Sequence, residues 1–515
     1  MVRQTHHERI FNNNFTLHSV RPESVEGLLG ALSRVENRAK LPTMISSATA
    51  GPLSTMGVRQ LIATMREFRA RLLGLVIDLD DKQIIGPRLT IVNPPLWEIG
   101  HVAWTQEFWV LRHLRKENPL LENGDRLYNS TDVAHDTRWE LLLPSREQTL
   151  SYMNEVIERC VARIERSEQL SADEFYFYWL TSFHEAMHAE ALAYTRQTLG
   201  YPAPRFADNV PAHAFGSGAH PGDVEIPGGK FIVGAEKNFP FVFDNEKWAH
   251  EVAVEPFRVA RAPVTNGEFL EFVEDGGYRE RRHWSDEGWR WLESGGAPQL
   301  EKSFAKFFAK SLSEPMEVAA FKERLDHPVY WQRLENGRWQ QRVYDRYVLL
   351  NEDLPVVHVS WYEAEAFCRW AGRRLPTEVE WEVAASGELS AEGARLSMRR
   401  RYYPWSDQAP LAESANLDWR AGGLVEVGAY PAGDSAFGCR QMIGNVWEWT
   451  ASDFQPYPGF SIDPYKEYSK PWFGTHKVLR GGCWATSALL IRNTWRNFYT
   501  PDRRDVWAGF RTCAT

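Results

Sequence analysis

The sequence predicts an α + (α+β) protein, in which a four-helix bundle precedes a domain of short strands, few helices and irregular loops. Apolar residues recur with three-to-four spacing up to Gly200, as they do in amphipathic helices. Residues 201–225 are rich in Pro and Gly, which is typical of an interdomain linker. Beyond them, short β-like runs alternate with loops rich in Gly, Pro and Trp. We therefore expect a bundle, a linker and a second domain over residues 51–205, 206–225 and 226–515.

The composition is that of an ordinary globular protein. The chain has 515 residues, 43% hydrophobic and 25% charged, and this length suggests two or three domains. A net charge of −9 gives no basic surface for nucleic acid. No apolar run reaches the roughly 18 residues of a membrane span. Five scattered cysteines without a CxxC pair, and no secretory-type N-terminal segment, favour the cytoplasm. The polar residues 1–50 are expected to be a disordered extension.

Each expected bundle helix has a recognisable start or end. The second helix follows Pro94-Pro95, since proline is tolerated in a first helical turn. Ser145 and Ser171 are the expected N-caps of the third and fourth helices, and Gly200 ends the fourth. Bundles of this kind build metal sites from side chains on facing helices. The expected helices cover 58–76, 96–114, 146–166 and 173–199.

In the second domain, short runs of apolar and β-branched residues between Gly and Pro predict strands. The predicted strands cover 230–233, 250–259, 356–359 and 476–480, and the predicted helices cover 266–274 and 361–371.

The most informative string of the chain is His184-Glu-Ala-Met-His188. In a helix its two histidines lie four residues apart on one face, where two imidazoles can bind one metal ion. The same pattern occurs in zinc proteases, whose general base would here be Glu185. A protease also needs a third ligand downstream, and residues 189–195 contain no histidine. We therefore expect Glu185 to be either a structural carboxylate or one that supports a metal ligand.

His101 is the expected third ligand. It follows Asn93-Pro-Pro-Leu-Trp-Glu-Ile-Gly on the second bundle helix, and a facing helix can bring it opposite the His184/His188 pair. Three histidines leave up to three metal positions open, which suits Fe(II) binding a substrate together with O₂. Zinc in a three-histidine site is the alternative metal, and the residues alone do not choose between them.

Four strings in the second domain resemble the formylglycine-generating-enzyme fold, a variant of the C-type-lectin fold. In chain order they are Arg374-Leu-Pro-Thr-Glu-Val-Glu-Trp-Glu, Gly444-Asn-Val-Trp-Glu-Trp-Thr, Arg480-Gly-Gly-Cys-Trp-Ala-Thr and Gly509-Phe-Arg. This resemblance implies a fold and not a function. The cysteine pair that forms formylglycine is missing, because Thr486 and Ile491 stand at the two places. That activity is therefore not expected.

A DinB-like four-helix bundle with His-x₃-His, joined to such a second domain, resembles the ergothioneine-type sulfoxide synthases. The resemblance implies that His101, His184 and His188 hold a non-heme Fe(II). It also implies hercynine (trimethylhistidine) and O₂ as substrates, with the sulfur of a thiol joined to the imidazole carbon. In the string Tyr465-Lys-Glu-Tyr-Ser, it implies that Tyr465 is the proton donor, a role for which a phenol is chemically suited.

The sequence departs from thiol-using members at the residues for the chalcogen donor. Those members carry two arginines, in a string like Arg-x-x-Arg-x-x-Leu-Pro, that hold the carboxylates of γ-glutamylcysteine. Here Arg138 is kept, His135 replaces the other arginine, and Asp136 is added. This stretch is most similar to the selenoneine synthase branch, which implies a selenosugar donor and a C–Se bond. Arg138, His135 and Asp136 are therefore the candidate donor-binding residues.

Asn497-Phe-Tyr stands where some thiol-using members have Trp-Asp beside the hercynine site. The rings of Phe498 and Tyr499 can contact a trimethylammonium group by cation–π interaction, which makes them candidate hercynine-binding residues. Two other functions stay open: a sulfoxide synthase that uses γ-glutamylcysteine or cysteine, and a non-catalytic, metal-bearing lectin-like module. Cys483 stands at a usual serine position, either as a plain substitution or as a contact to the chalcogen donor.

Overall fold

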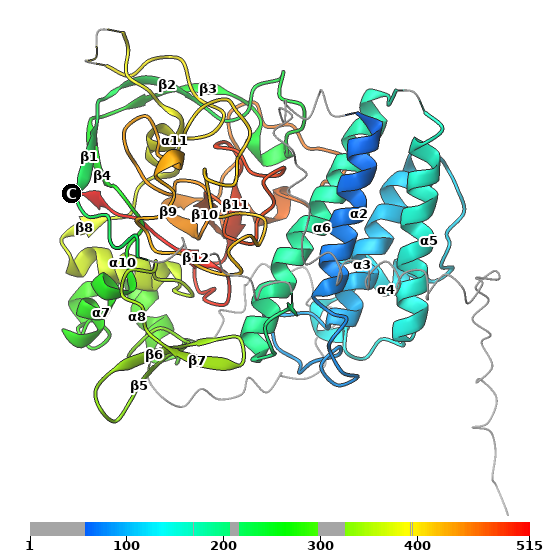
Figure 1. Ribbon diagram of the computed structural model, residues 1–515, viewed down its shortest axis with the longest axis horizontal. Coiled ribbons are helices and arrows are strands. Elements are labelled where there is room, and N and C mark those ends of the chain that lie inside the picture. Colours follow the sequence, from blue (N-terminus) through cyan, green and yellow to red (C-terminus); the bar gives the residue numbers. More distant parts are fainter. Residues whose placement is uncertain (1–56, 168, 206–215, 297–324, 392, 394) are drawn as a thin grey trace, which may run out of the picture.

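The computed structural model describes residues 57–167, 169–205, 216–296, 325–391, 393 and 395–515. A helical bundle lies beside a mixed domain of sheets and helices (Figure 1), and this arrangement confirms the predicted fold class. The predicted extension, residues 1–50, and residues 206–215 of the predicted linker lie outside the described part of the chain. None of the helices in that part combines the length and the apolar character needed to cross a membrane.

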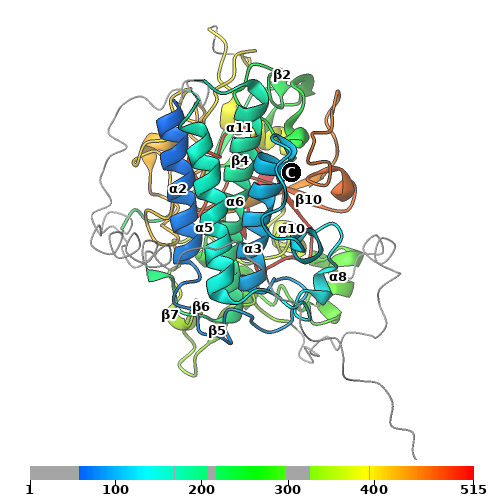
Figure 2. The ribbon, with the colours of Figure 1, turned by 90° about the vertical axis from the view of Figure 1, so that its right-hand side faces the viewer.

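The four predicted bundle helices are all present, and Figure 2 shows them side by side along their length. Capping boxes begin two of them, because Ser145 and Ser171 each accept a hydrogen bond from the backbone N–H three residues later. Gly200 ends the last helix in the left-handed conformation that glycine adopts without strain. The helices are α2 (Val58–Gly74), α3 (Pro95–Gln106), α5 (Arg146–Ile164) and α6 (Ala172–Leu199).

The predicted helix 96–114 changes type part-way along. After α3 it continues as the π-helical segment Glu107–His113, a form that inserts an extra residue and turns the following side chains. Within this segment Trp109 stacks on Phe177 of α6, with ring centroids 5.2 Å apart. The short helix α4 (Gly124–Tyr128) and a 3₁₀ turn, His135–Thr137, follow before α5 begins.

Short strands make four small sheets in the second domain. Two sheets have four strands, in the orders β1-β4-β13-β8 and β11-β10-β9-β12, while β2 pairs with β3 and β5-β6-β7 form a three-stranded sheet. Neighbouring strands are antiparallel except β12 and β9. The strands are β1 (Asp223–Ile226), β2 (Gly229–Val233), β3 (His250–Val254), β4 (Phe257–Ala260), β5 (Trp331–Arg333), β6 (Trp339–Val343), β7 (Arg346–Leu349), β8 (Arg373–Arg374), β9 (Trp447–Asp453), β10 (Lys477–Arg480), β11 (Asn497–Tyr499), β12 (Ala508–Gly509) and β13 (Cys513–Ala514).

In the described part of the chain, four α-helices accompany these sheets: α7 (Asn266–Glu274), α8 (Asp286–Glu293), α10 (Trp361–Trp370) and α11 (Glu378–Ser386). The sequence predicts α7 and α10 but not α8 or α11. Both missed helices are short, with 8 and 9 residues, and α11 is buried on nearly every side, so its apolar residues do not mark one face. The capping box from Thr377 to Glu380, at the start of α11, is nevertheless readable in the sequence.

The predicted strand 356–359 is wrong. His358 has a φ of +61°, which interrupts extended backbone in the middle of the run. The run is apolar because it is a buried loop, in which Val356 and Val359 have no exposed surface. A buried loop and a buried strand both require apolar side chains, so the pattern alone does not separate them.

A carboxylate on α6 joins the bundle to the second domain. Trp447 of β9 donates its indole N–H to Glu190 at 2.6 Å, and the Thr486 hydroxyl donates to the other carboxylate oxygen, also at 2.6 Å. All three residues are at most 7% exposed. Buried polar groups of this kind stabilise a structure only when all of them are paired. Glu190 therefore fixes how α6 lies against β9 and the loop that follows β10.

Replacing Glu190 by alanine is expected to lower stability, because it leaves the indole N–H and the Thr486 hydroxyl buried without an acceptor. Each unpaired group costs about 1–3 kcal/mol, so the midpoint of thermal unfolding should fall by several degrees in calorimetry. The exposed carboxylate Glu158 of α5 is the matched control, and its alanine variant should stay within about 0.5 kcal/mol. Equal midpoints for the two variants would contradict the interdomain role of Glu190.

Candidate metal centre

Helices α3 and α6 bring three histidine side chains to one point. His101 comes from α3, and His184 and His188 come from α6. One ring nitrogen of each lies within 4.8 Å of the others, and the Nε2 atoms of His184 and His188 are 3.2 Å apart. Nitrogen ligands about 2.1 Å from one metal ion, at right angles, lie about 3.0 Å apart. The spacing of the His184/His188 pair therefore fits two adjacent positions on a single metal ion.

Two of these rings donate a hydrogen bond from Nδ1. Their other nitrogen, Nε2, therefore carries no proton in the neutral ring. The Nδ1–H of His101 donates to the carbonyl of Tyr128 at 2.7 Å, and the Nδ1–H of His188 donates to the carboxylate of Glu98 at 2.8 Å. Such outer partners fix the ring orientation of metal-binding histidines. In the neutral ring, the Nε2 lone pair then faces the centre.

Burial favours the neutral form of two of the three rings. Desolvation and, after it, the neighbouring His188 lower the pKa of His101 and of His184 well below the usual range. Lone pairs that converge in a buried space repel one another unless a cation lies between them. The donor set therefore fits a divalent metal ion, and imidazole nitrogen suits iron as well as zinc.

Two residues that precede His101 on α3 support its position. The indole of Trp97 stacks on the His101 ring, with centroids 4.9 Å apart and planes at 7°. A Cβ on Gly100 would lie 2.4 Å from the ring of Tyr128, so only glycine allows the approach that brings the Tyr128 carbonyl to His101. Glu98, which holds His188, is 1% exposed. The sequence analysis did not single out Trp97 or Glu98, although both lie one helical turn before His101.

The carboxylate of Glu185 forms a buried ion pair with a residue of another helix. Arg69 of α2 donates its Nε–H to Glu185 at 2.6 Å, and the two side chains are 5% and 1% exposed. The same guanidinium donates to the carbonyl of Met153 and to the side chain of Gln106. Glu185 thus binds α6 to α2, and this contact agrees with the expectation of a structural carboxylate.

Tyr465 lies beside the histidines although it belongs to the second domain. Its ring centroid is 6.2 Å from that of His184 and 6.2 Å from that of Trp109. It comes from the loop between β9 and β10. Burial, followed by the charge of Glu467, raises the pKa of Tyr465 to about 12. The phenol is therefore protonated at neutral pH, as a proton donor must be.

The three candidate donor-binding residues are engaged in different ways. The Arg138 guanidinium lies 3.8 Å from the ring of Trp97, on which His101 also stacks, and burial lowers the pKa of Arg138 to about 10. His135 Nε2 lies 2.6 Å from the carbonyl of Val92, and Asp136 lies 3.6 Å from Arg88. Of the three, Arg138 is the one joined by ring contacts to a histidine of the centre.

Phe498 and Tyr499 are neighbours on β11, so their side chains point to opposite faces of the strand. Phe498 stacks on Phe454, with centroids 4.1 Å apart, and meets Tyr468 edge-on at 6.1 Å. Tyr468 is in turn 6.0 Å from Tyr465. Tyr499 lies under the Arg503 guanidinium at 5.0 Å. Phe498 is therefore on the Tyr465 side of the strand.

Cys483 lies in the interdomain turn rather than among the partners of the histidines. It has no exposed surface, and its sulfur is 3.6 Å from the Thr486 hydroxyl. Burial, and then Glu190, raise the pKa of the Cys483 thiol well above its usual value. A thiol in this state is a poor nucleophile, which favours a packing role for Cys483.

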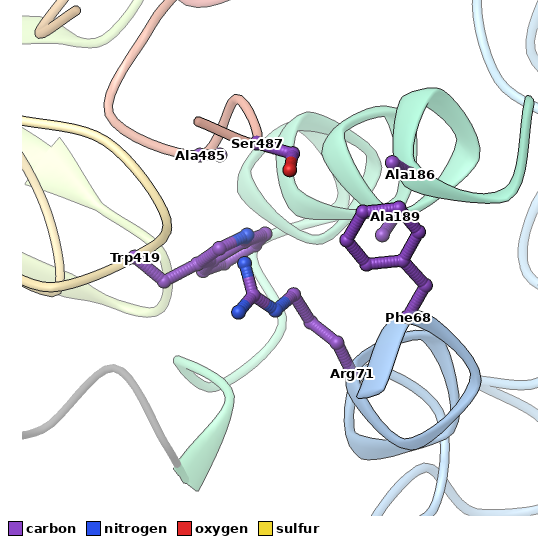
Figure 3. Close-up of a pocket in the computed structure, with 7 residues that line it drawn as sticks. All are labelled: Phe68, Arg71, Ala186, Ala189, Trp419, Ala485 and Ser487. Atoms are coloured by element: carbon purple, nitrogen blue, oxygen red, sulfur yellow. The ribbon is translucent and has the colours of Figure 1, made fainter. Parts of the chain in front are cut away.

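A small cavity lies between α2, α6 and the second domain (Figure 3). Its volume is about 10 Å³, which is room for about one water molecule. It is too small for an amino-acid-sized substrate and does not include the three histidines. Its lining residues are Phe68, Arg71, Ala186, Ala189, Trp419, Ala485 and Ser487.

Comparison with known proteins identifies both parts of the chain. Residues 64–194 match the DinB superfamily, and residues 211–515 match the sulfatase-modifying factor enzyme 1-like domain. The chain is 36% identical over 468 residues to a hercynine oxygenase of Mycolicibacterium thermoresistibile, covering 88% of this chain and 93% of that protein. The chain belongs to the hercynine oxygenase family. A second member of the family, from Mycolicibacterium smegmatis, is 34% identical and covers 87% of this chain and 96% of its own.

A formylglycine-generating enzyme of Mycobacterium tuberculosis is also similar, with 33% identity over 251 residues. The similarity covers 47% of this chain and 76% of that protein. Where that activity would need two cysteines, this member of the hercynine oxygenase family has Thr486, whose hydroxyl is hydrogen-bonded to Glu190, and Ile491, which is 1% exposed. The residue at the first position thus makes a hydrogen bond between the domains, and the residue at the second is buried.

Removing Arg69 should be more harmful than removing the whole ion pair with Glu185. Arg69→Met leaves a buried carboxylate without compensation and should lower the free energy of unfolding by about 3–5 kcal/mol. The double variant Arg69→Met/Glu185→Leu removes both charges and should regain most of this loss. Urea unfolding followed by circular dichroism measures both. Equal losses in the two variants would mean that the ion pair does not hold α6 against α2.

Proposed function

We propose that this protein is a non-heme Fe(II), O₂-dependent oxidoreductase that forms a carbon–selenium or carbon–sulfur bond at the imidazole of hercynine. One observation carries the proposal: three imidazole nitrogens converge beside the phenol of Tyr465 in a chain of the hercynine oxygenase family. Two relatives that cover most of this chain are named hercynine oxygenases, and the proposal extends their substrate to this protein.

We propose that His101, His184 and His188 hold the iron. The described residues supply three nitrogen ligands at this point, whereas structural zinc sites are closed by four protein ligands. Three neutral ligands leave positions for both substrate and O₂. Iron, when bound, would supply O₂ activation and a position for the imidazole of hercynine. The protein buries His101 and His184 and fixes the direction of the His101 and His188 rings by hydrogen bonds.

Tyr465 is proposed to be the catalytic acid. Its phenol is protonated at neutral pH, and the ring contacts of Trp109 and Tyr468 on either side, at 6.2 and 6.0 Å, support its orientation. A protonated phenol held next to the reacting atoms can donate its own proton directly. Hercynine itself is proposed to lie against Phe498 and Tyr499, of which one ring faces its trimethylammonium group.

For the chalcogen donor we propose Arg138 with His135 and Asp136, and a preference for a selenosugar. A donor with two carboxylates, such as γ-glutamylcysteine, is held best by paired arginines. Arg138 stands without such a partner in this stretch, since His135 contacts a backbone carbonyl and Asp136 lies near Arg88. A sugar needs hydrogen-bonding groups rather than a second arginine. The second candidate, a sulfoxide synthase using γ-glutamylcysteine or cysteine, is favoured by the similarity to the two hercynine oxygenases.

Within this proposal, residues 51–205 form the metal-binding domain, and residues 226–515 form the domain that contributes Tyr465 and closes the site, with 206–225 between them. We propose a cytoplasmic location as well. All five cysteines are buried free thiols, which is usual in a reducing compartment.

Iron-loaded protein incubated with hercynine, O₂ and one donor at a time tests the proposal. We expect O₂ consumption and a hercynine-derived product with the selenosugar, and less with γ-glutamylcysteine. The His184→Ala variant should lose the metal and the reaction, whereas His250→Ala, in β3 of the second domain, should keep both. Turnover of γ-glutamylcysteine but not of the selenosugar would overturn the selenium preference. Bound metal without hercynine-dependent O₂ consumption would instead point to a binding module.

Replacing Tyr465 by phenylalanine should slow product formation by about 10²–10⁴-fold, the usual range for removal of a general acid. Hercynine binding should stay close to that of the unchanged protein, because the ring and its neighbours are kept. Tyr347→Phe is the control, since Tyr347 is 53% exposed on β7. Rate measurements at saturating hercynine, together with calorimetric binding, separate the two effects. An unchanged rate would remove Tyr465 from the chemistry.

A further inference from the structure

A continuous chain of hydrogen bonds joins Arg138 to His188. Arg138 Nη1 donates to Asn93 Oδ1 at 2.5 Å. Asn93 Nδ2 donates to Glu98 Oε2 at 3.1 Å, and His188 Nδ1 lies 2.8 Å from Glu98 Oε1. Asn93 and Glu98 thus link the proposed donor site to a proposed metal ligand, although neither belongs to those two sets.

The chemistry of Arg138 fixes which atom donates in each of these hydrogen bonds. A guanidinium only donates hydrogen bonds, so the Asn93 oxygen must face it and the Asn93 NH₂ must face Glu98. Both oxygens of Glu98 therefore accept, one from Asn93 and one from His188. As a consequence His188 carries its ring proton on Nδ1 and directs the bare Nε2 towards the centre. Reversal of any one link would place two donors or two acceptors against each other.

A second connection joins the same arginine to another of the three histidines. The Arg138 guanidinium lies 3.8 Å from the Trp97 ring, and the opposite stacking partner of Trp97 is His101, at 4.9 Å and nearly parallel. Arg138 thus acts on His188 through hydrogen bonds and on His101 through an aromatic stack.

Two of the four residues in this series of hydrogen bonds are buried. Glu98 is 1% exposed and Arg138 is 8% exposed, so the hydrogen bonds that they make are stronger than they would be in water. Among the described residues, Arg138 Nε is buried and has no hydrogen-bond partner. A donor molecule that binds the guanidinium would change the position and the effective charge of a group already joined to two histidines.

We propose that Asn93 and Glu98 are positioning residues that couple Arg138 to the metal centre. The coupling rests on the roles proposed above for Arg138 and for the three histidines. A donor molecule bound at Arg138 affects His188 through the hydrogen bonds and His101 through the stack. Thermodynamic linkage requires that metal binding change the affinity for the donor by the same factor. Donor binding at Arg138 and metal binding at the histidines are then cooperative through these two connections.

The affinity of the metal-free protein for Co(II), measured under nitrogen with a competing chelator, tests this coupling without hercynine, O₂ or turnover. Co(II) also reports its ligand geometry through its visible absorption bands. Glu98→Gln should weaken binding by about 10–100-fold, the usual effect of removing the outer partner of a metal-binding histidine. Arg138→Met, which is further from the metal, should weaken binding and shift the bands, and its effect should shrink in the Glu98→Gln background.

Asn93→Asp gives the sharpest result, because it keeps the size and the Arg138 contact but places an acceptor against Glu98. If the hydrogen-bond direction matters, Asn93→Asp should weaken Co(II) binding at least as much as Asn93→Ala does. If Asn93 only fills space, the aspartate variant should bind like the unchanged protein. That second result, or an Arg138→Met variant with unchanged affinity and bands, would overturn the proposal.

A buried glutamate on the same helical stretch is the matched control. Glu107 is 1% exposed and accepts a hydrogen bond from Tyr152 at 2.5 Å. It takes no part in the hydrogen bonds that link Arg138 to His188. Glu107→Gln should keep the Co(II) affinity within twofold. A fall in affinity as large as that of Glu98→Gln would mean that any buried change near α3 disturbs the metal, and it would overturn the specific role of Glu98. These affinities are measured without hercynine. A protein that did not turn over hercynine would therefore fail the proposed function without changing the result of this test.

Discussion

The convergence of three imidazole nitrogens at one point is the constraint on which the rest of this structure depends. Lone pairs held this close repel one another and have lost their water. The rings keep their positions because their outer nitrogens are tied down, His101 by the carbonyl of Tyr128 and His188 by Glu98. Helix α3 and helix α6 must therefore meet at one fixed register, which the neighbouring contacts maintain.

Helix α6 keeps this register because neighbouring side chains on its different faces bind different parts of the protein. Glu185 pairs with Arg69 of α2, Met187 accepts a hydrogen bond from Tyr468, and Glu190 accepts from Trp447 and Thr486. The histidines face α3. One helix thus connects the bundle, the metal centre and the second domain, and a shift of α6 would break a buried polar contact on at least one side.

The second domain contributes what the bundle lacks, a protonated phenol beside the histidines. Tyr465 belongs to the loop between β9 and β10, and β9 is the strand that carries Trp447, the partner of Glu190. The interdomain contact and the position of the phenol therefore share one structural element. In the proposed function, a domain without the formylglycine cysteines contributes one phenol to a metal centre that the bundle would hold.

The sequence by itself determined the features whose signals are local. The bundle helices follow from apolar spacing, from the caps Ser145 and Ser171 and from Gly200, and the pairing of His184 with His188 follows from helical geometry. Local signals failed at 356–359, where a buried loop has the same apolar pattern as a strand. Only the tertiary structure decided the contacts of Glu185 with Arg69, of Glu98 with His188 and of Glu190 with Trp447. These partners lie 116, 90 and 257 residues apart in the chain. A buried carboxylate takes its role from whichever donor the packing brings to it, and no pattern along the chain specifies that donor.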